Sequence, residues 1–402
     1  MNTRRLTEDI SSAAELIRQG GLVAVPTETV YGLAGNGLDA DAVQKIYEVK
    51  GRPTVKPLSL MVPDESAMEL CCHDVPPQAY VLAHKFWPGP LTIVLPAREH
   101  IPPIVLAGGD TVGLRCPDHP LTLELLHTCG LPLAAPSANP SGEPSPKTAE
   151  QVFSYFDGKI EAVIDGGSCG IGKESTLIDM SAAPYRILRQ GALPAETIAD
   201  VLAENMQVVG ITGGSGGGKT TALRVLEEQG ALILDCDAIY HDLLQTSDEL
   251  LGEISSAFPG TVANGTLDRR ALAAKVFADD AALRCLNQIT HRYVFNAVAE
   301  LLRKHAMRGG TLAAIDAVEL VSSGLSKRCT TTLAVLADAE KRAARIMARD
   351  HIGQDAAMAR IRAQRPDRYY QENCGHILWN NADRQQFEQD CRQLFKEILN
   401  HG

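Results

Sequence analysis

The stretch Gly210-Ile-Thr-Gly-Gly-Ser-Gly-Gly-Gly-Lys-Thr-Thr221 lies near the midpoint of the 402-residue chain and decides how the rest is organised. Within it, Gly213, Gly218, Lys219 and Thr220 fill the pattern G-x-x-x-x-G-K-[ST]. In this pattern the backbone amides of a glycine-rich turn surround phosphate groups. The glycines let the backbone approach the phosphate closely and adopt positive φ angles. The stretch therefore predicts a phosphate-binding loop that separates two halves of the chain.

The flanking residues support this interpretation over a flexible glycine linker. Residues 207–212 have the composition of a short buried strand, and residues 220–229 carry apolar side chains at helical spacing. The loop would thus end at a helix N-terminus, where free amides and the helix dipole favour an anion. We expect Lys219 to reach the β and γ phosphates of ATP and the Thr220 hydroxyl to bind Mg²⁺. The predicted ATP-binding residues here are Gly213, Gly214, Ser215, Gly216, Gly217, Gly218, Lys219, Thr220 and Thr221.

Net charge and cysteine content indicate which partners and which cellular compartment to expect. Residues 1–205 carry 15 Lys+Arg against 25 Asp+Glu, a net of −10, which leaves −1 of the total −11 for the remainder. Neither half has the net positive charge that is typical of an autonomous nucleic-acid-binding domain. The charge therefore does not favour direct tRNA binding, which remains an open alternative. Ten cysteines without a C-x-x-C pair are typical of a reduced, cytoplasmic protein. No signal peptide or apolar membrane span is evident, so no membrane partner is expected.

The first half carries hydroxyl and cationic residues at segment ends. Residues 26–33, Pro-Thr-Glu-Thr-Val-Tyr-Gly-Leu, follow a predicted buried strand at 22–25 and are equally compatible with a site or a capped turn. A predicted helix over 41–49 then delivers Lys50-Gly-Arg-Pro-Thr-Val-Lys56. Three cations within seven residues suit a triphosphate, although a short charge run is more often an exposed turn.

These blocks resemble the threonylcarbamoyl-AMP synthase family, the YrdC-like domain. The resemblance extends from about residue 6 to 193 and includes, in the family's order, Trp87–Thr92, Val112–Pro117, Ala135–Gly142, Asp165–Gly167, Glu174–Ile178 and Ile187–Gly191. It implies condensation of L-threonine, bicarbonate and ATP into threonylcarbamoyl-adenylate and diphosphate, for tRNA modification. It also implies that the adenylate is handed to a tRNA threonylcarbamoyl transferase complex.

The resemblance assigns roles to individual residues. Those implied to bind ATP are Lys50, Arg52, Lys56, Ser137, Asn139 and Arg189, and those implied to bind threonine are Thr29, Arg115 and Ser175. The Arg115 guanidinium would pair with the substrate carboxylate in a fork geometry. Taken alone, the Ser and Asn residues could equally cap turns. No nucleophilic triad is expected.

The second half continues with a predicted strand at 231–234 that ends in Asp235-Cys-Asp237. A carboxylate at the carboxyl end of a parallel strand lies where open α/β sheets bind ligands, which makes Asp237 the candidate base. The phosphate loop followed by D-x-D-x-I resembles dephospho-coenzyme A kinase, over residues 207–399. The resemblance implies transfer of the ATP γ phosphate to the 3′-hydroxyl of dephospho-coenzyme A, with Asp237, Lys219 and Arg349 as catalytic residues.

Two features of this half bear on that assignment. The family's central strand motif is altered in Asp316-Ala-Val-Glu-Leu-Val-Ser322, and a charged Glu319 in a strand expected to be buried would be costly unless it is paired or faces the cleft. The Arg-rich run over 340–350 is typical of a nucleotide-kinase lid. On this helix we expect Arg349 to close over the transferred phosphate, and Arg342 and Arg345 to lie on a solvated face.

The predicted fold class is α/β, with an N-terminal YrdC-like twisted open sheet and a C-terminal P-loop kinase that has a parallel sheet and a helical lid. The predicted limits are 1–194 for the first domain, 195–206 for a linker and 207–402 for the second domain. Three alternatives remain open at this point. The kinase could act on another hydroxyl acceptor, one half could be a nucleotide-sensing module without catalysis, or the first half could bind tRNA.

Overall fold

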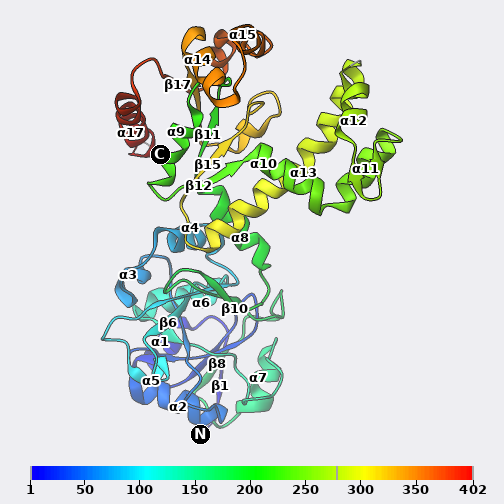
Figure 1. Cartoon of the computed structure of the whole chain (residues 1–402). Coiled ribbons are helices and arrows are strands. Elements are labelled where there is room, and N and C mark those ends of the chain that lie inside the picture. Colours follow the sequence, from blue (N-terminus) through cyan, green and yellow to red (C-terminus); the bar gives the residue numbers. More distant parts are fainter. Residues whose placement is uncertain (1, 278, 401–402) are drawn as a thin grey trace. The chain divides into compact units, whose positions relative to one another are not determined.

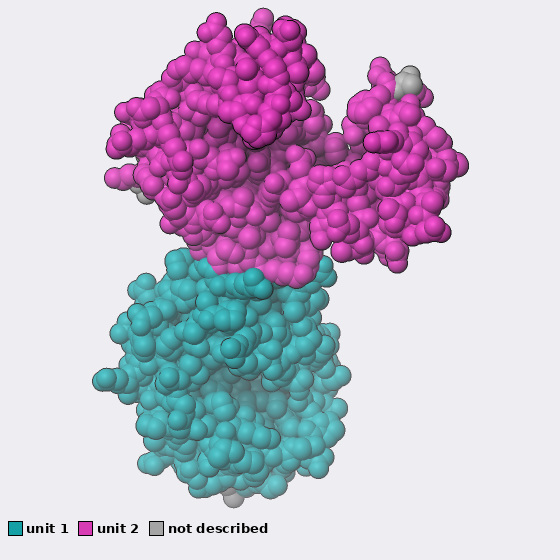
Figure 2. Space-filling view, viewed as in Figure 1, with its two compact units in different colours: residues 1–204, 307–309 teal, residues 205–306, 310–402 magenta. Residues whose placement is uncertain are grey.

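The computed structural model describes residues 2–277 and 279–400 (Figure 1). The chain divides into two compact units (Figure 2). Unit 1 comprises residues 1–204 and 307–309, and unit 2 comprises residues 205–306 and 310–402. Helix α8 (Ala195–Glu204), in the stretch predicted as a linker, is grouped with unit 1.

A mixed ten-stranded sheet forms the centre of unit 1, in the order β1-β8-β2-β3-β7-β4-β6-β5-β9-β10. Its strands are β1 (Arg4–Leu6), β2 (Val23–Val25), β3 (Gly32–Asn36), β4 (Ser59–Met61), β5 (Leu91–Pro96), β6 (Thr111–Arg115), β7 (Leu133–Ala134), β8 (Ala162–Ile164), β9 (Thr176–Asp179) and β10 (Arg186–Arg189). Its other helices are α1 (Ile10–Arg18), α2 (Ala40–Lys50), α3 (Ala67–Cys71), α4 (Pro77–Phe86), α5 (Pro103–Leu106), α6 (Pro120–Cys129) and α7 (Ala149–Phe156).

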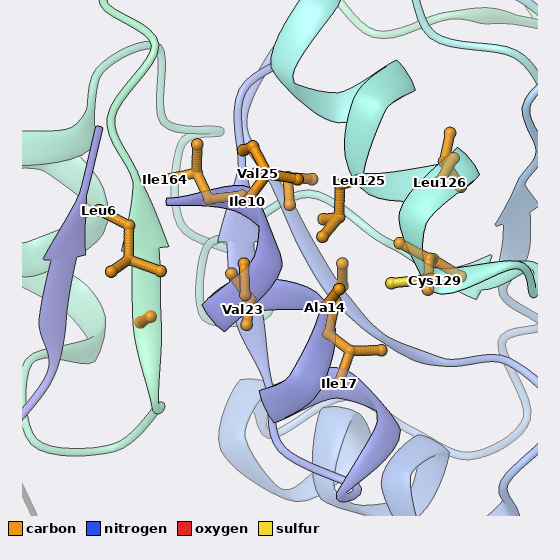
Figure 3. Close-up of a cluster of buried hydrophobic side chains, with 14 of the residues drawn as sticks. Leu6, Ile10, Ala14, Ile17, Val23, Val25, Leu125, Leu126, Cys129 and Ile164 are labelled. Carbon is orange, nitrogen blue, oxygen red and sulfur yellow. The ribbon is translucent and has the colours of Figure 1, made fainter. Parts of the chain in front are cut away.

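The main apolar core of unit 1 lies between the sheet and helices α1 and α6 (Figure 3). Helix α1 begins where the Asp9 carboxylate accepts the Ser12 amide, a standard N-terminal cap. Its apolar residues at helical spacing, Ile10, Ala14 and Ile17, are buried against strand β2 and helix α6. This core supports the sheet from which the site residues described below project.

Strand register brings distant residues of unit 1 onto one face of the sheet. Strand β4 runs parallel to β6 with Met61 opposite Arg115, and β5 runs parallel to β9 with Thr92 opposite Leu177. Residues opposite each other in adjacent strands point to the same face. Segments separated by more than 80 residues in sequence therefore supply the wall of a single cavity.

Unit 2 contains a five-stranded sheet whose strands are all parallel, in the order β12-β15-β11-β16-β17. They are β11 (Gln207–Thr212), β12 (Leu232–Asp235), β15 (Leu312–Asp316), β16 (Thr331–Leu336) and β17 (His376–Trp379). Helices α9 (Lys219–Glu227) and α17 (Arg384–Asn400) pack against it through a core that includes Leu226, Phe387 and Phe395. The central position of β11 places the loop that follows it in the middle of the sheet edge.

Two further parts of unit 2 have apolar clusters of their own. One contains α10 (Cys236–Thr246), α11 (Asp248–Ala257), α12 (Arg269–Val276), α13 (Asp280–Met307) and the hairpin β13 (Val262–Ala263) and β14 (Thr266–Leu267). The other pairs α14 (Ala339–Asp350) with α15 (Gln354–Arg362) around Ile346. The 3₁₀ helix η1 (Leu325–Arg328) and helix α16 (Asp367–Asn373) complete the unit. The predicted α/β fold class is confirmed for both halves.

The expectation of a buried strand through residues 316–322 is wrong. Strand β15 ends at Asp316, and Glu319 lies exposed in the turn that follows. Its carboxylate accepts a hydrogen bond from the Ser322 hydroxyl and lies 3.9 Å from Arg365 Nη2. Because Glu319 remains in solvent, it carries no burial penalty.

Candidate functional sites

A cavity of about 170 Å³ in unit 1 collects most of the predicted synthase residues. Its wall includes residues of strands β4, β5, β6, β9 and β10 and of the loops before β4 and after β7. Five of the nine residues predicted from the resemblance line it, namely Arg52, Arg115, Ser137, Ser175 and Arg189. Three of these are guanidinium groups contributed by distant parts of the chain.

Arg115 is held rigidly at the base of this arrangement. Its side chain is 9% exposed, and its Nη2 atom lies 2.7 Å from Glu28 Oε1 and 2.8 Å from Thr29 Oγ1. The other Glu28 oxygen accepts the Asp118 amide at 3.0 Å, which fixes the carboxylate. Thr29 does not line the cavity, but this contact connects it directly to Arg115.

Arg189, the last residue of β10, lies beside Ser175, which directly precedes the neighbouring strand β9. Its Nε and Nη2 atoms donate to the Ser175 carbonyl at 3.1 and 2.9 Å, and Nη2 also reaches the Ser175 hydroxyl at 3.1 Å. That hydroxyl forms a further 2.8 Å hydrogen bond with Thr92. The network orients both the guanidinium and the hydroxyl relative to the cavity.

The guanidinium groups raise the electrostatic potential of the cavity. Burial lowers the pKa of Arg189, Arg115 and Arg52 lower it further, and Glu174 opposes these effects. Burial also lowers the pKa of Arg52, whose Nη2 donates to the Pro57 carbonyl at 3.0 Å. Cations held close together in this way are stabilised by an anion placed between them. The cavity is therefore suited to an anionic ligand.

Lys50, Lys56 and Asn139 lie outside the cavity wall. Lys50 is buried and donates to the carbonyls of Ser137 and Asn139, so it braces the turn that carries Ser137. Burial, with Arg52 nearby, lowers the Lys50 pKa to about 7. Lys56 is exposed. The buried Asn139 Oδ1 receives no hydrogen bond from any described residue.

Two acidic residues at this site were missed in the sequence analysis. Glu28 accepts a hydrogen bond from Arg115. Glu174 lines the cavity and accepts a hydrogen bond from the Ser145 hydroxyl at 2.7 Å, and this bond lowers the pKa of Glu174. Glu28 lies within residues 26–33, and Glu174 begins the Glu174–Ile178 block. A buried arginine needs an acidic partner, and that rule could have drawn attention to Glu28.

The phosphate loop of unit 2 joins β11 to α9, as the pattern predicts. Gly213, Gly216 and Gly218 have φ angles of 131°, 77° and 110°, which favour glycine. The Lys219 ammonium donates to the Gly213 carbonyl at 3.3 Å and lies 3.8 Å from Asp316 Oδ1. Lys219 is thus already directed toward the carboxyl end of the sheet.

Gly214 has no positive φ angle, but a side chain at this position would displace its neighbours. A Cβ atom there would overlap the guanidinium of Arg342 and approach Gln364 Oε1 to 2.6 Å. At Gly218, a Cβ atom would overlap the amide of Asn380. The glycines of this loop therefore make room for protein side chains as well as for phosphate.

Three carboxylates gather at the carboxyl edge of the parallel sheet. Asp235 and Asp316 are opposite each other in strands β12 and β15, and Asp237 lies in the first turn of α10. Asp235 Oδ1 caps this helix by accepting the amides of Asp237 and Ala238 at 2.9 and 3.0 Å. Burial raises the pKa of Asp316, Lys219 opposes this, and the charges of Asp235 and Asp237 add to it.

The remaining residues of the predicted kinase site are exposed or paired elsewhere. Asp237 and Thr220 are exposed at the edge of the sheet, and Thr221 is partly buried. The Arg349 side chain is 61% exposed and donates to both oxygens of Asp350, at 2.7 and 3.0 Å. The structure brings Lys219 and Asp316 together, whereas Arg349 forms no described hydrogen bond with the loop.

The expectation that Arg342 and Arg345 lie on a solvated face is wrong. Arg342 is 5% exposed, and its Nε atom donates to the Ser215 carbonyl at 3.0 Å. Arg345 Nη1 donates to the carbonyls of Gly216 and Gly217 at 3.1 and 3.4 Å. These arginines contact the loop because the carbonyls on its outer side require donors.

The two sites define a class of protein: unit 1 has a strand-walled cavity for an anion, and unit 2 has a P-loop kinase fold. A family model described as "Telomere recombination" (Sua5/YciO/YrdC) matches residues 15–191, and a model described as "Dephospho-CoA kinase" (CoaE) matches residues 207–386. The chain belongs to the Sua5/YciO/YrdC family and carries a CoaE domain after it. The resemblance stated from the sequence is confirmed.

Two threonylcarbamoyl-AMP synthases match about half of the chain or less. A threonylcarbamoyl-AMP synthase of Pyrococcus abyssi is 48% identical over 206 residues, 51% of this chain and 61% of the relative's length. One of Pseudomonas aeruginosa is 36% identical over 166 residues, 41% of this chain and 89% of the relative. A crystal structure of P. abyssi Sua5 complexed with L-threonine is 29% identical, covers 82% of this chain and 96% of that chain, and has a TM-score of 0.49.

Proposed function

We propose that the chain is a bifunctional enzyme. One activity condenses L-threonine, bicarbonate and ATP into L-threonylcarbamoyladenylate and diphosphate. The other transfers the γ phosphate of ATP to the 3′-hydroxyl of dephospho-coenzyme A. Each activity would reside in its own unit, since each unit has the residues of one site.

The main support for the adenylate-forming activity is that Arg52, Arg115 and Arg189 line one cavity. Three cations from distant segments suit substrates that bring a carboxylate, a bicarbonate and a triphosphate. Arg115, with Thr29 beside it, would bind the threonine carboxylate, while Ser175 orients the amino acid. The threonine amine would attack the carbon of bicarbonate with loss of water to give a carbamate, and a carbamate oxygen would then attack the α phosphate of ATP and displace diphosphate. The chain contributes positioning and charge neutralisation.

The position of Lys219 between the phosphate loop and Asp316 carries the second assignment. Lys219 would neutralise charge on the transferred phosphate, and Asp237 would orient the acceptor hydroxyl or take its proton. Arg349 would have to leave Asp350 to reach the phosphate, which a mobile lid allows. The same loop would serve another hydroxyl acceptor equally well.

Mg²⁺ is proposed as the metal of the kinase reaction, and the donors at the sheet edge fit it. Thr220 offers an exposed hydroxyl and Asp316 a carboxylate, both oxygen ligands of the kind that Mg²⁺ prefers. The described residues include no cluster of three or more His, Cys, Asp or Glu that could hold a metal by themselves. The ion would therefore bind together with nucleotide phosphates, whose charge it would help to neutralise.

Further partners follow only from the proposed activity. The adenylate would be handed to a tRNA threonylcarbamoyl transferase complex, and direct tRNA binding is not part of the proposal. No helix among the described residues is long and apolar enough to cross a membrane.

The test is product analysis with purified full-length protein and Mg-ATP. Threonine plus bicarbonate should yield the adenylate and diphosphate, and dephospho-coenzyme A should yield coenzyme A and ADP. If diphosphate forms but dephospho-coenzyme A stays unmodified, the second assignment is wrong in its acceptor. If ATP binds to either unit without turnover of any tested substrate, that unit is a nucleotide-sensing module.

A further inference from the structure

Two arginines of helix α14, Arg342 and Arg345, donate hydrogen bonds to carbonyls of the phosphate loop. The proposed mechanism does not use either of them. The side chain of Arg342 is 6% exposed and contacts the phosphate loop, the turn between α15 and α16, and the start of α16. Its Nε atom donates to the Ser215 carbonyl at 3.0 Å, Nη2 donates to Gln364 Oε1, and Nη1 lies 3.7 Å from Asp367 Oδ1. All three nitrogens thus have partners, one in the phosphate loop and two in the segment that follows α15.

Gln364 completes the set of contacts around Ser215. Its Oε1 atom accepts the Ser215 amide at 3.0 Å, and its Nε2 atom donates to the Ser215 hydroxyl at 2.8 Å. Together with Arg342, it engages the amide, the carbonyl and the hydroxyl of Ser215. Two residues, 127 and 149 positions downstream, therefore bind every polar group of Ser215 in the phosphate loop.

We propose that Arg342 is a positioning residue for nucleotide binding: by holding Ser215 directly and through Gln364, it fixes the backbone of the phosphate loop in the conformation that receives phosphate. Glycine-rich turns lose much conformational entropy on ordering, and a loop fixed beforehand binds phosphate with a smaller loss. The positive charge of Arg342 also strengthens its hydrogen bond to the Ser215 carbonyl on the outer side of the loop. Arg342 acts through Ser215 and does not touch the nucleotide.

Gly214 provides independent support for this arrangement. It has no positive φ angle in the structure, so backbone conformation does not require a glycine there. A side chain would nevertheless overlap Arg342. The absence of a Cβ at this position thus permits the approach of the guanidinium to the loop.

The experiment compares Arg342→Met and Gln364→Leu with Arg368→Met in the full-length protein. Arg368 is a matched control from the same region: its side chain is 84% exposed, and its ion pair within the described part of the chain is with Glu372. Mg-ATP binding is measured by calorimetry, and folding by melting temperature without ligand. Removing a charge-assisted hydrogen bond should weaken ATP binding about 10- to 100-fold in Arg342→Met. The loss should be smaller in Gln364→Leu and absent in Arg368→Met.

A kinetic measurement separates positioning from general damage. The inference predicts a raised KM for ATP with the KM for the acceptor unchanged, and the threonine-dependent reaction of unit 1 should be unaffected. Wild-type ATP affinity in a folded Arg342→Met protein would overturn the inference. If Arg342→Met does not fold, wild-type ATP affinity in Gln364→Leu would do so.

The inference rests on nucleotide binding at the loop, as the proposed function does, but the two can fail separately. If the unmodified protein binds ATP and does not phosphorylate dephospho-coenzyme A, the proposed acceptor is wrong. Weaker ATP binding in Arg342→Met would still support the inference in that case.

Discussion

The two sites use arginine in different ways. In unit 1, Arg115 and Arg189 project from strands, line the cavity themselves and are fixed by partners such as Glu28 and Ser175. In unit 2, Arg342 and Arg345 lie on a helix and bind the outer side of a loop whose amides would contact the ligand. The first site has its charges in place in a rigid sheet, whereas the second depends on a helix pair to shape its backbone. Ligand binding at the first site should therefore depend on the side chains that line it. Ligand binding at the second site should depend also on the arginines that hold the backbone of the loop.

The largest expected effect separates the two active sites. Lys219→Ala should lower phosphate transfer to the acceptor by about 1,000-fold, because no other described ammonium group lies near both the loop and Asp316. The same variant should keep full diphosphate release with threonine and bicarbonate. Arg52→Ala should show the reverse pattern. Parallel loss of both reactions in either variant would contradict two independent sites.

Buried and exposed ion pairs of unit 1 should differ in their effect on stability. Arg115→Met leaves the Glu28 carboxylate, 13% exposed, without its partner, and should lower the free energy of unfolding by about 3 kcal/mol. Arg5→Met, which removes a 44% exposed arginine, should change it by no more than about 1 kcal/mol. Urea unfolding measures both. Replacing Glu28 by Gln in the Arg115→Met protein should recover part of the loss, and equal effects of the two single variants would refute the comparison.

The glycines of unit 2 offer a smaller, graded test. Gly214→Ala should weaken ATP binding about tenfold, because the added Cβ displaces Arg342. Gly252→Ala is the control, since its Cβ meets nothing within 4 Å in helix α11. That substitution should stabilise the protein by about 0.5 to 1 kcal/mol without changing ATP affinity. Tight ATP binding by Gly214→Ala would show that the loop tolerates loss of its outer support.

The smallest expected effect is a shift in pH dependence. Burial raises the pKa of Asp316, with Asp235 and Asp237 adding to the shift and Lys219 opposing it. As pH falls through this raised value, Asp316 takes up a proton and Lys219 loses its partner, so kinase activity should decline at a higher pH than for an ordinary aspartate. Because the folded state binds this proton more tightly than the unfolded chain, acidification there should not lower stability at Asp316. The measurement is kinase activity as a function of pH. If the decline at low pH is the same in Asp316→Asn as in the unmodified protein, the group that titrates is not Asp316.

The sequence by itself determined the two-part organisation. A glycine-rich loop with Lys219 between a strand and a helix has a local geometry that neighbouring residues dictate, so its position and its role in phosphate binding could be predicted. The order of the motifs in residues 6–193 likewise predicted the family and five residues that line the cavity. The domain limits and the roles of individual site residues stay predictions.

Only the tertiary structure decided which arginines support the loop and which lie in solvent. Arg342, Arg345 and Arg349 lie within one helix and look alike in sequence. Their surroundings depend on how α14 packs against a loop about 130 residues away. The same holds for Lys50, which braces a turn 87 residues downstream in place of facing the cavity, and for Glu319, which a turn leaves in solvent. The local sequence determines which functional groups a segment carries. Long-range packing determines which of these polar groups are buried away from water and therefore need hydrogen-bond partners within the protein.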